Sequence, residues 1–583
     1  MDSVPGESGY CSTTGIYRSP LVPPLELPSV SLPHFLLFST PAPPTKPAFV
    51  DAVSGDSLSY AELHSLTAAA ASALSSAGLR RGDLALLVSP NSIHYPVLAL
   101  AVLSLGAVLS TANPLLTHSE LQTQVRDSEP VLIIAAVELI RKLDGLLPSR
   151  PLIPFEAFLA SLPREVDPPL PDVDVGPGDP ATVMYSSGTT GKSKGVVSTH
   201  GNLTAMASLL RRVWGGDARR DDVYACVVPL SHMFGFSVLV CGTLASGATT
   251  VVLRRYAVGQ LLTAVEQHRV TRLPAVPPVV VQMARSCRAG SAGGRDLRSL
   301  KEVICSGAPI AREHLERFVE CFPGTTLSQV KSHVLMHCSY ADRRITIGWS
   351  SSNYNNNNYN HHHPARATHA QQNGVFSRWT TGITSNISHP KKELNSQVER
   401  NVRCVSLQES SYNQVVVNGG RSNKIRRQII CSNQLHYCCA HLLGMRMGEC
   451  YGLTETSGPI TVCDGVKGRF HVSIGRLIPT MEARIADVRT GKALPPNQHG
   501  ELCVRGPLVM QGYMKSKEAT SLAIDRDGWL HTGDLCYIDT RGLVYVADRI
   551  KELIKYKAYQ VSPAELEEVL STHPDVLDVA VTS

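Results

Sequence analysis

A run of glycines, hydroxyl residues and lysines between two apolar segments is the most restrictive feature of the sequence. It extends from Tyr185 to Val196 and reads Tyr-Ser-Ser-Gly-Thr-Thr-Gly-Lys-Ser-Lys-Gly-Val. Glycines let backbone N–H groups turn toward one point, while hydroxyls and lysines add donors and positive charge. The run therefore predicts a loop that holds nucleotide phosphates. A flexible Ser/Gly linker is the structural alternative, but it would not explain why lysines occur at a fixed spacing beside an apolar strand.

The Walker A loop is a competing explanation of the same residues. Gly191-Lys192-Ser193 matches the end of that motif, but Ser186 stands where its first glycine belongs. The following residues, 195–200, have the pattern of a strand, whereas a Walker A loop continues into a helix. The sequence therefore favours a phosphate loop of another kind.

Apolar segments alternate with helical patterns on both sides of this loop. Ser59-Tyr-Ala-Glu62 has the form of a capping box, and the Ala/Leu-rich helix that follows is expected to end at Gly78. Strand–helix alternation of this kind predicts parallel α/β layers. The strands are expected at 84–89, 131–136, 182–185, 223–228, 249–253, 302–305, 501–505 and 543–546, and a buried helix at 96–107.

Two segments depart from this alternation. Residues 1–45 are rich in proline and serine and are expected to be irregular. Residues 330–449 contain an asparagine run and His361-His362-His363 but no sustained periodicity, so a disordered insert is expected. A metal-binding insert is the functional alternative, although no spaced Cys/His ligand set accompanies the histidines.

Composition narrows the classes of partner. The 583 residues are 43% hydrophobic and carry a net charge of +6, with basic residues dispersed among acidic ones, so we expect no nucleic-acid partner. The 15 cysteines include no C-x-x-C pair, which is typical of a reducing compartment. The longest apolar stretch, 97–109, is too short for a membrane span. A monomer is expected.

Six short motifs follow one another along the chain. They are Tyr185–Val196, Pro229-Leu-Ser-His-Met-Phe-Gly235, Ser306-Gly-Ala-Pro309, Tyr451-Gly-Leu-Thr-Glu455, Gly528-Trp-Leu-His-Thr-Gly-Asp534 and Asp548–Val561. Each motif is weak alone, but together and in this order they resemble those of the adenylate-forming superfamily, which comprises acyl-CoA synthetases, luciferases and peptide-synthetase adenylation domains. The likeness is greatest to the plant 4-coumarate–CoA ligase-like branch and covers roughly 50–329 and 450–583.

The resemblance implies a fold and a reaction. The fold would be α/β, with a large multi-layered domain of parallel sheets, helices and a small β-barrel part (46–329 and 450–548), and a truncated α+β lid (549–583). The reaction would use ATP, Mg²⁺ and coenzyme A. A carboxylate attacks the α-phosphate to give acyl-AMP and pyrophosphate, and the CoA thiol then displaces AMP.

The resemblance also assigns roles to individual residues. ATP would be bound by Ser186, Ser187, Gly188, Thr189, Thr190, Lys194, Gln329, Cys450, Tyr451, Thr454, Asp534 and Arg549. Catalytic or hinge roles would fall to His232, Thr454, Glu455, Lys551, Lys555 and Gln560, with Glu455 also holding Mg²⁺. Phe234, Cys305, Ala308 and Gly452 would line the acyl pocket, and Arg255, Lys557 and Ala558 would face CoA.

Departures from the family pattern keep other functions open. Phe234 replaces the tyrosine usual in coumarate ligases, so fatty acids or oxylipin precursors are alternatives to hydroxycinnamates, and Ala558 replaces a usual glycine. Joining Gln329 to Cys450 would restore the family's continuous segment, which suggests that 330–449 is a translated intron. The shortened lid lacks the family's late lysine, so weak adenylation is expected. A luciferase-like enzyme or an inactive nucleotide-binding protein are further alternatives, and the compartment would be cytoplasm or peroxisome.

Overall fold

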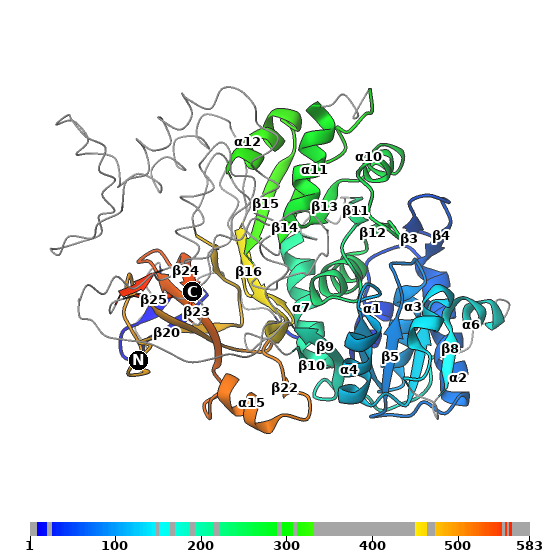
Figure 1. Ribbon diagram of the computed structural model, residues 1–583, viewed down its shortest axis with the longest axis horizontal. Helices are drawn as coiled ribbons and strands as arrows, with labels where there is room; N and C mark the ends of the chain where they lie inside the picture. Colours follow the sequence, from blue (N-terminus) through cyan, green and yellow to red (C-terminus); the bar gives the residue numbers. More distant parts are fainter. Residues whose placement is uncertain are drawn as a thin grey trace, which may run out of the picture. The chain divides into compact units, whose positions relative to one another are not determined.

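Three sheets organise the part of the chain that the computed structural model describes (Figure 1). The described residues are 8–19, 26–146, 151–163, 169–186, 193–214, 221–288, 294–306, 312–331, 449–462, 473–550, 554–556 and 559–561, all within one unit of the chain. Only the backbone is described at several element ends, including 328–331, 449–450, 554–556 and 559–561. The predicted insert, 330–449, and lid, 549–583, therefore lie mostly outside the described residues.

The first sheet has seven strands in the order β22-β10-β9-β6-β5-β7-β8, and its central strands are parallel. Apolar runs make the central strands buried, as the four buried residues of β7, Leu-Ile-Ile-Ala, show. Its strands are β5 (Leu84–Val88), β6 (Val108–Ala112), β7 (Leu132–Ala135), β8 (Leu152–Pro154), β9 (Pro180–Ser186), β10 (Lys194–Thr199) and β22 (Gly512–Tyr513). The helices between them are α2 (Tyr60–Ser76), α3 (Tyr95–Ser104), α4 (His118–Ser128), α5 (Ile140–Leu143) and α6 (Phe155–Ser161), with the 3₁₀ turn η1 (Val137–Leu139).

The second sheet has nine strands in the order β17-β16-β15-β14-β13-β11-β12-β3-β4, parallel from β16 to β3. Figure 1 shows α10, α11 and α12 alongside these strands. The strands are β3 (Pro47–Asp51), β4 (Ser57–Ser59), β11 (Val223–Cys226), β12 (Thr249–Val252), β13 (Arg272–Ala275), β14 (Glu302–Ser306), β15 (Thr326–Lys331), β16 (Glu449–Leu453) and β17 (Gly458–Pro459). The helices are α7 (His200–Trp214), α8 (Met233–Phe236), the π-helix η2 (Ser237–Gly242), α9 (Thr243–Ser246), α10 (Val258–Gln267), α11 (Pro277–Arg288) and α12 (Arg312–Cys321).

The third sheet is antiparallel, with six strands in the order β1-β2-β20-β21-β23-β24. They are β1 (Tyr10–Cys11), β2 (Ile16–Arg18), β20 (Glu482–Ala486), β21 (Gly500–Arg505), β23 (Leu530–Ile538) and β24 (Val544–Arg549). Shorter elements complete the description: α1 (Leu32–Phe38), η3 (Thr454–Thr456), α15 (Lys517–Ala523), and the strand pairs β18 (Thr461–Val462) with β19 (Arg476–Leu477) and β25 (Ile554–Tyr556) with β26 (Tyr559–Val561).

The α/β prediction is confirmed, and so is the capping box at Ser59 and Glu62 that begins α2. The prediction of an irregular N-terminal segment is wrong for several described residues, because β1, β2 and α1 lie within 1–45. Pro33 stands in the first turn of α1, where proline is tolerated, and Leu32, Phe35 and Leu36 bury one face of that helix. Among the described residues, no helix combines the length and apolar character that a membrane span requires.

The two ends of the predicted insert lie in neighbouring strands. The structure places β15 and β16 side by side as parallel neighbours, with Gln329 level with Glu449 and Val330 level with Cys450. Parallel neighbours need a long connection between them, whereas a direct join makes one strand. The chain with residues 332–448 in place therefore has one more strand here than a directly joined chain would have.

Candidate active site

The hairpin of β9 and β10 presents the two ends of the phosphate-loop motif. Ser186 is the last residue of β9, Lys194 is the first of β10, and the two are paired in register. β10 is a strand antiparallel to β9, which confirms the feature that distinguishes this motif from a Walker A loop. The loop residues Ser187, Gly188, Thr189 and Thr190 lie outside the described part of the chain.

Glu455 joins this hairpin to the nine-stranded sheet. It lies in η3, directly after β16, and its Oε1 accepts hydrogen bonds from Ser186 Oγ at 3.1 Å and from the hydroxyl of Tyr513 at 3.0 Å. The Tyr513 ring also lies 4.9 Å from the Nζ of Lys194, within range of a cation–π interaction. A carboxylate, an ammonium group and two hydroxyls thus meet at the end of β9.

Burial, and then the charge of Glu455, raises the pKa of Tyr513 well above its ordinary value. Tyr513 therefore remains a donor to the carboxylate at neutral pH. Tyr513 was not among the residues singled out from the sequence, because a two-residue strand such as β22 has no periodicity to reveal it. The only signal in the sequence is the Gly512-Tyr513 pair after an apolar segment.

Thr454 precedes Glu455 and is buried, at 2% exposure. Its Oγ1 is sealed from solvent and has no hydrogen-bond partner among the described residues. A buried hydroxyl without a partner costs about 1–3 kcal/mol, so such groups usually have one. Thr454 lies beside the phosphate-loop hairpin, where its hydroxyl is an unused hydrogen-bond donor among the described residues.

Tyr451, Asp534 and Arg549 form a second buried cluster, between the nine-stranded and six-stranded sheets. The Tyr451 hydroxyl donates to Asp534 Oδ2, and the Nε of Arg549 lies 3.6 Å from Asp534 Oδ1. Asp534 and Arg549 are register partners on β23 and β24. Burial, followed by the charge of Asp534, raises the pKa of Tyr451 well above its ordinary value. Three of the predicted ATP-binding residues are thus adjacent.

His232 caps the short helix α8 beside Phe234. Its Nδ1 accepts a hydrogen bond from the Phe234 N–H at 3.2 Å, so the ring proton is on Nε2. Burial lowers the pKa of His232 to about 4, which makes the ring neutral at pH 7. Nε2 is sealed and has no partner among the described residues. His232 therefore offers one N–H donor to a ligand.

The remaining acyl-pocket residues are small or half-buried. Phe234 is half-buried, and Cys305 is fully buried in β14, where burial raises the pKa of its thiol and keeps it protonated. A Cβ at Gly452 would lie 2.3 Å from the Gly458 carbonyl oxygen, so only glycine fits there. Ala308 lies outside the described residues. Within those residues, no hydrogen bond connects the turn at His232 to Glu455.

The predicted CoA-side and lid residues are not assembled into a site by the described part of the chain. Arg255 is 81% exposed in its side chain and lies 3.4 Å from Glu138. Lys555 and Gln560 face each other across β25 and β26, with only their backbone described. Gln329 and Cys450 are likewise described by backbone alone. Lys551, Lys557 and Ala558 lie outside the described residues.

Comparisons with known proteins give the same family. The sequence profile of the AMP-binding enzyme family matches residues 39–330 and 430–514. A 4-coumarate–CoA ligase-like protein of rice (Oryza sativa subsp. japonica) is 41% identical over 608 aligned residues, which cover 98% of this chain and 86% of that protein. The peroxisomal OPC-8:0-CoA ligase 1 of Arabidopsis thaliana is 32% identical, with 100% of this chain and 86% of that protein covered.

Solved structures agree on the fold. The ATP-bound MatB of Rhodopseudomonas palustris superimposes with a TM-score of 0.66 at 22% identity, covering 95% of this chain and 86% of that one. The o-succinylbenzoate CoA synthetase of Bacillus subtilis, solved with ATP and magnesium, gives a TM-score of 0.64 at 21% identity, with coverages of 95% and 87%. The chain belongs to the AMP-binding, adenylate-forming enzyme family, in its plant 4-coumarate–CoA ligase-like branch.

Proposed function

We propose that the chain activates a carboxylic acid with ATP and transfers the acyl group to coenzyme A. The convergence of Ser186, Lys194 and Glu455 at the end of β9 carries this proposal, because it places a cation, hydroxyl donors and a carboxylate at one point. Oxygen ligands suit Mg²⁺, which prefers carboxylates and phosphate oxygens. Glu455 fits that ion, and when bound the ion would neutralise charge developing on the phosphates.

The residues of the chain would divide the work as follows. Lys194 and the hydroxyl of Ser186 would bind the triphosphate, and Asp534 would accept from the ribose hydroxyls, with Arg549 and Tyr451 holding its carboxylate. Thr454 would donate its buried hydroxyl to the α-phosphate. The neutral His232 would direct its Nε2–H toward the carboxylate or the adenylate oxygen. Preorganised donors of this kind stabilise charge that grows in the transition state.

The acid is proposed to be a hydroxycinnamate or an oxylipin-type carboxylate. The relatives include proteins named for both classes. Phe234 provides an apolar wall where a tyrosine would offer a hydroxyl to a phenolic ring. A hydrophobic wall discriminates weakly between acids, so we expect activity with longer apolar acids at least equal to that with 4-coumarate.

A two-part assay tests the function. Pyrophosphate release is measured with ATP, Mg²⁺ and a panel of acids, and thioester formation is then followed by mass spectrometry with and without CoA. Pyrophosphate and thioester together support the ligase. Pyrophosphate and AMP without thioester would support a luciferase-like adenylate former, and ATP binding without pyrophosphate release would support an inactive nucleotide-binding protein.

We also propose that residues 330–449 are encoded by a retained intron. The family profile leaves residues 331–429 of this segment unmatched, and its second match begins at 430. Sequencing of transcripts across this region tests the idea, and peptides from within 332–448 in the native protein would contradict it. Cytoplasm or peroxisome is the proposed compartment, since one relative is named as peroxisomal, and imaging of a tagged chain distinguishes the two.

A further inference from the structure

A bulge in β23 places Asp534 inside the six-stranded sheet. Glu501 pairs with Leu535 and Cys503 pairs with His531, so Thr532, Gly533 and Asp534 together stand opposite a single residue of β21. The strand pair is therefore irregular at the residue that reaches Tyr451 and Arg549. Bulges re-aim side chains and lose regular ladder hydrogen bonds, so they need other support.

The support comes from side chains of the bulge and from β21. Gly533, which has a φ of +74°, donates its N–H to Glu501 Oε1 at 3.0 Å. Thr532 Oγ1 donates to the Leu502 carbonyl at 2.8 Å, and the Asp534 N–H donates to Thr532 Oγ1 at 3.2 Å. Glycine adopts a positive φ without steric cost. An N–H group that lost its hydrogen bond at this position would cost free energy. Glu501 therefore fixes the Thr532–Gly533 peptide group, one residue before Asp534.

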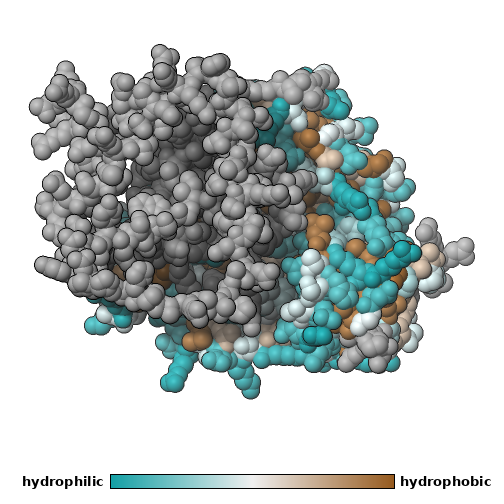
Figure 2. Space-filling model, in the orientation of Figure 1, coloured by the Kyte–Doolittle hydropathy of each residue, from teal (hydrophilic) through white to brown (hydrophobic). Residues whose placement is uncertain are grey.

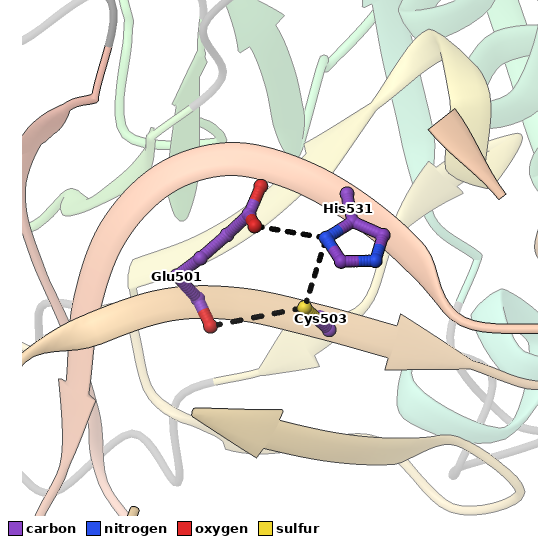
Figure 3. A group of neighbouring side chains, drawn as sticks. All are labelled: Glu501, Cys503 and His531. Carbon is purple, nitrogen blue, oxygen red and sulfur yellow. Dashed lines mark hydrogen bonds and ion pairs between the residues drawn. The ribbon is translucent and has the colours of Figure 1, made fainter. Parts of the chain in front are cut away.

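Glu501 is itself held by His531. Figure 3 shows the His531 ring above Cys503, with Nδ1 directed at Glu501. The Nδ1–Oε2 distance is 2.8 Å, and His531 Nε2 lies 3.7 Å from Asp525 Oδ2. Hydrogen bonding with Cys503 and with Glu501 raises the pKa of His531 to about 10, so the ring is charged at neutral pH. The carboxylate of Glu501 thus has a cation on one oxygen and the Gly533 N–H on the other.

The same three side chains offer nitrogen, sulfur and oxygen atoms that could bind a transition metal. Their spacing favours the hydrogen-bonded pair. Two ligand atoms of a tetrahedral zinc ion, each about 2 Å from the metal, lie about 3.3 Å apart. Nδ1 of His531 and Oε2 of Glu501 are closer than that, at a normal hydrogen-bond distance.

We propose that Glu501, oriented by His531, is a positioning residue for nucleotide binding: it holds the bulge that presents Asp534 to the ribose. The inference rests on the proposed function, in which Asp534 accepts from the ribose hydroxyls. Neither Glu501 nor His531 touches the nucleotide in this arrangement. Their effect passes through the backbone of Gly533 to the carboxylate of Asp534.

The test compares the affinities of the full chain for ATP and for 2′-deoxy-ATP by calorimetry. The unaltered chain is expected to bind ATP roughly tenfold or more tightly than 2′-deoxy-ATP, since a hydrogen bond to a charged group is lost. In Glu501→Ala the affinity for ATP should fall about tenfold, and the ratio between the two nucleotides should shrink toward 1. Glu501→Gln keeps an acceptor for the Gly533 N–H. It should restore most of the ATP affinity and most of the ratio between the two nucleotides.

Glu482→Ala is the matched control. Glu482 lies in the same sheet and pairs with Arg505 at 2.6 Å and Arg18 at 2.8 Å, away from the bulge. Thermal unfolding of both alanine variants shows how much each loses in stability, and the ratio of the two affinities is unaffected by a smaller folded fraction. An unchanged ratio in Glu501→Ala would overturn the proposal, as would stoichiometric zinc found by elemental analysis. If the unaltered chain binds no ATP, the proposed function fails instead.

Discussion

The parallel sheets and the antiparallel sheet present their site residues in different ways. Ser186, Lys194 and Glu455 stand at the ends of strands or directly after them, beside strand interiors that are mostly buried. Asp534 stands in the middle of β23 at 1% exposure, and it depends on Tyr451 and Arg549. A charge inside a sheet is stable only when its neighbours satisfy it. Changes in the antiparallel sheet should therefore affect stability and binding together, and changes at parallel strand ends mainly activity.

The largest effect is expected from Glu455→Gln. The amide keeps the size of the side chain and can still accept from Ser186 and Tyr513, but it lacks the charge that a magnesium ion requires. Pyrophosphate release should fall by roughly 10²- to 10³-fold. The free energy of unfolding, measured by thermal denaturation, should stay within about 0.5 kcal/mol of that of the unaltered chain, since no buried charge loses its partner.

Glu138→Gln is the control for that variant, because Glu138 pairs with Arg254 at 2.9 Å, outside the Glu455 cluster. It should leave pyrophosphate release unchanged. A Glu455→Gln protein that retained its activity but lost stability would reverse the distinction drawn between the two kinds of sheet.

Asp534→Asn tests the other side of the comparison. It removes the charge opposite Arg549, the last residue of β24, whose side chain is 13% exposed. The free energy of unfolding should fall by about 2–4 kcal/mol, and the affinity for ATP should fall roughly a hundredfold. Urea denaturation and calorimetry measure the two quantities. An Asp534→Asn protein that lost affinity for ATP but kept its free energy of unfolding would show that the buried charge of Asp534 does not affect stability.

Tyr513→Phe should have a smaller effect. It removes the hydroxyl that donates to Glu455 and keeps the ring that faces Lys194. One hydrogen bond to a carboxylate is lost, so the half-saturating concentration of Mg²⁺ should rise about fivefold to tenfold. Tyr513→Leu also removes the ring, and ATP affinity should then fall a further few-fold.

Tyr537→Phe provides a matched tyrosine control in the six-stranded sheet, where Tyr537 stacks on Tyr545. Its magnesium dependence should equal that of the unaltered chain. Equal magnesium curves for Tyr513→Phe and Tyr537→Phe would exclude a role for the Tyr513 hydroxyl in orienting Glu455.

The parallel region should also lose stability in acid, through two of its histidines. Burial lowers the pKa of His232 and of His200 to about 4, whereas histidines of the unfolded chain titrate near 6.5. Between these values only the unfolded chain takes up the protons. Stability is therefore unchanged above pH 6.5, falls by at most about 1.4 kcal/mol per pH unit for each histidine on going down to pH 4, and levels off below.

Urea midpoints at pH 7 and pH 5 measure this loss. His200→Asn should reduce it, because an asparagine oxygen can take over the hydrogen bond that Nδ1 accepts from the Leu32 N–H at 3.2 Å. An identical pH dependence in the variant would show that His200 does not contribute.

The strands of the parallel region and its phosphate loop were largely predictable from the sequence, because each is marked by residues that are neighbours in the chain. Apolar runs marked β5, β9 and β14, and the small residues after β9 marked the phosphate loop. The supports of the antiparallel sheet were not predictable, since they depend on register. Glu501 and His531 are 30 positions apart, and only the bulge brings them together. Tyr513 was missed because its two-residue strand has no periodicity and because it lies 58 positions from Glu455.

The pairing of β15 with β16 has a consequence for any shortened form of the chain. Val330 and Cys450 lie at the same level on two neighbouring strands. If Gln329 were joined to Cys450, one strand would replace β15 and β16. Either the residues before the join or Cys450 and Tyr451 would then move sideways by about 4.8 Å, the spacing between strands. The Tyr451–Asp534 contact would be kept only if the merged strand took the position of β16, so excision would rearrange the sheet rather than trim a loop.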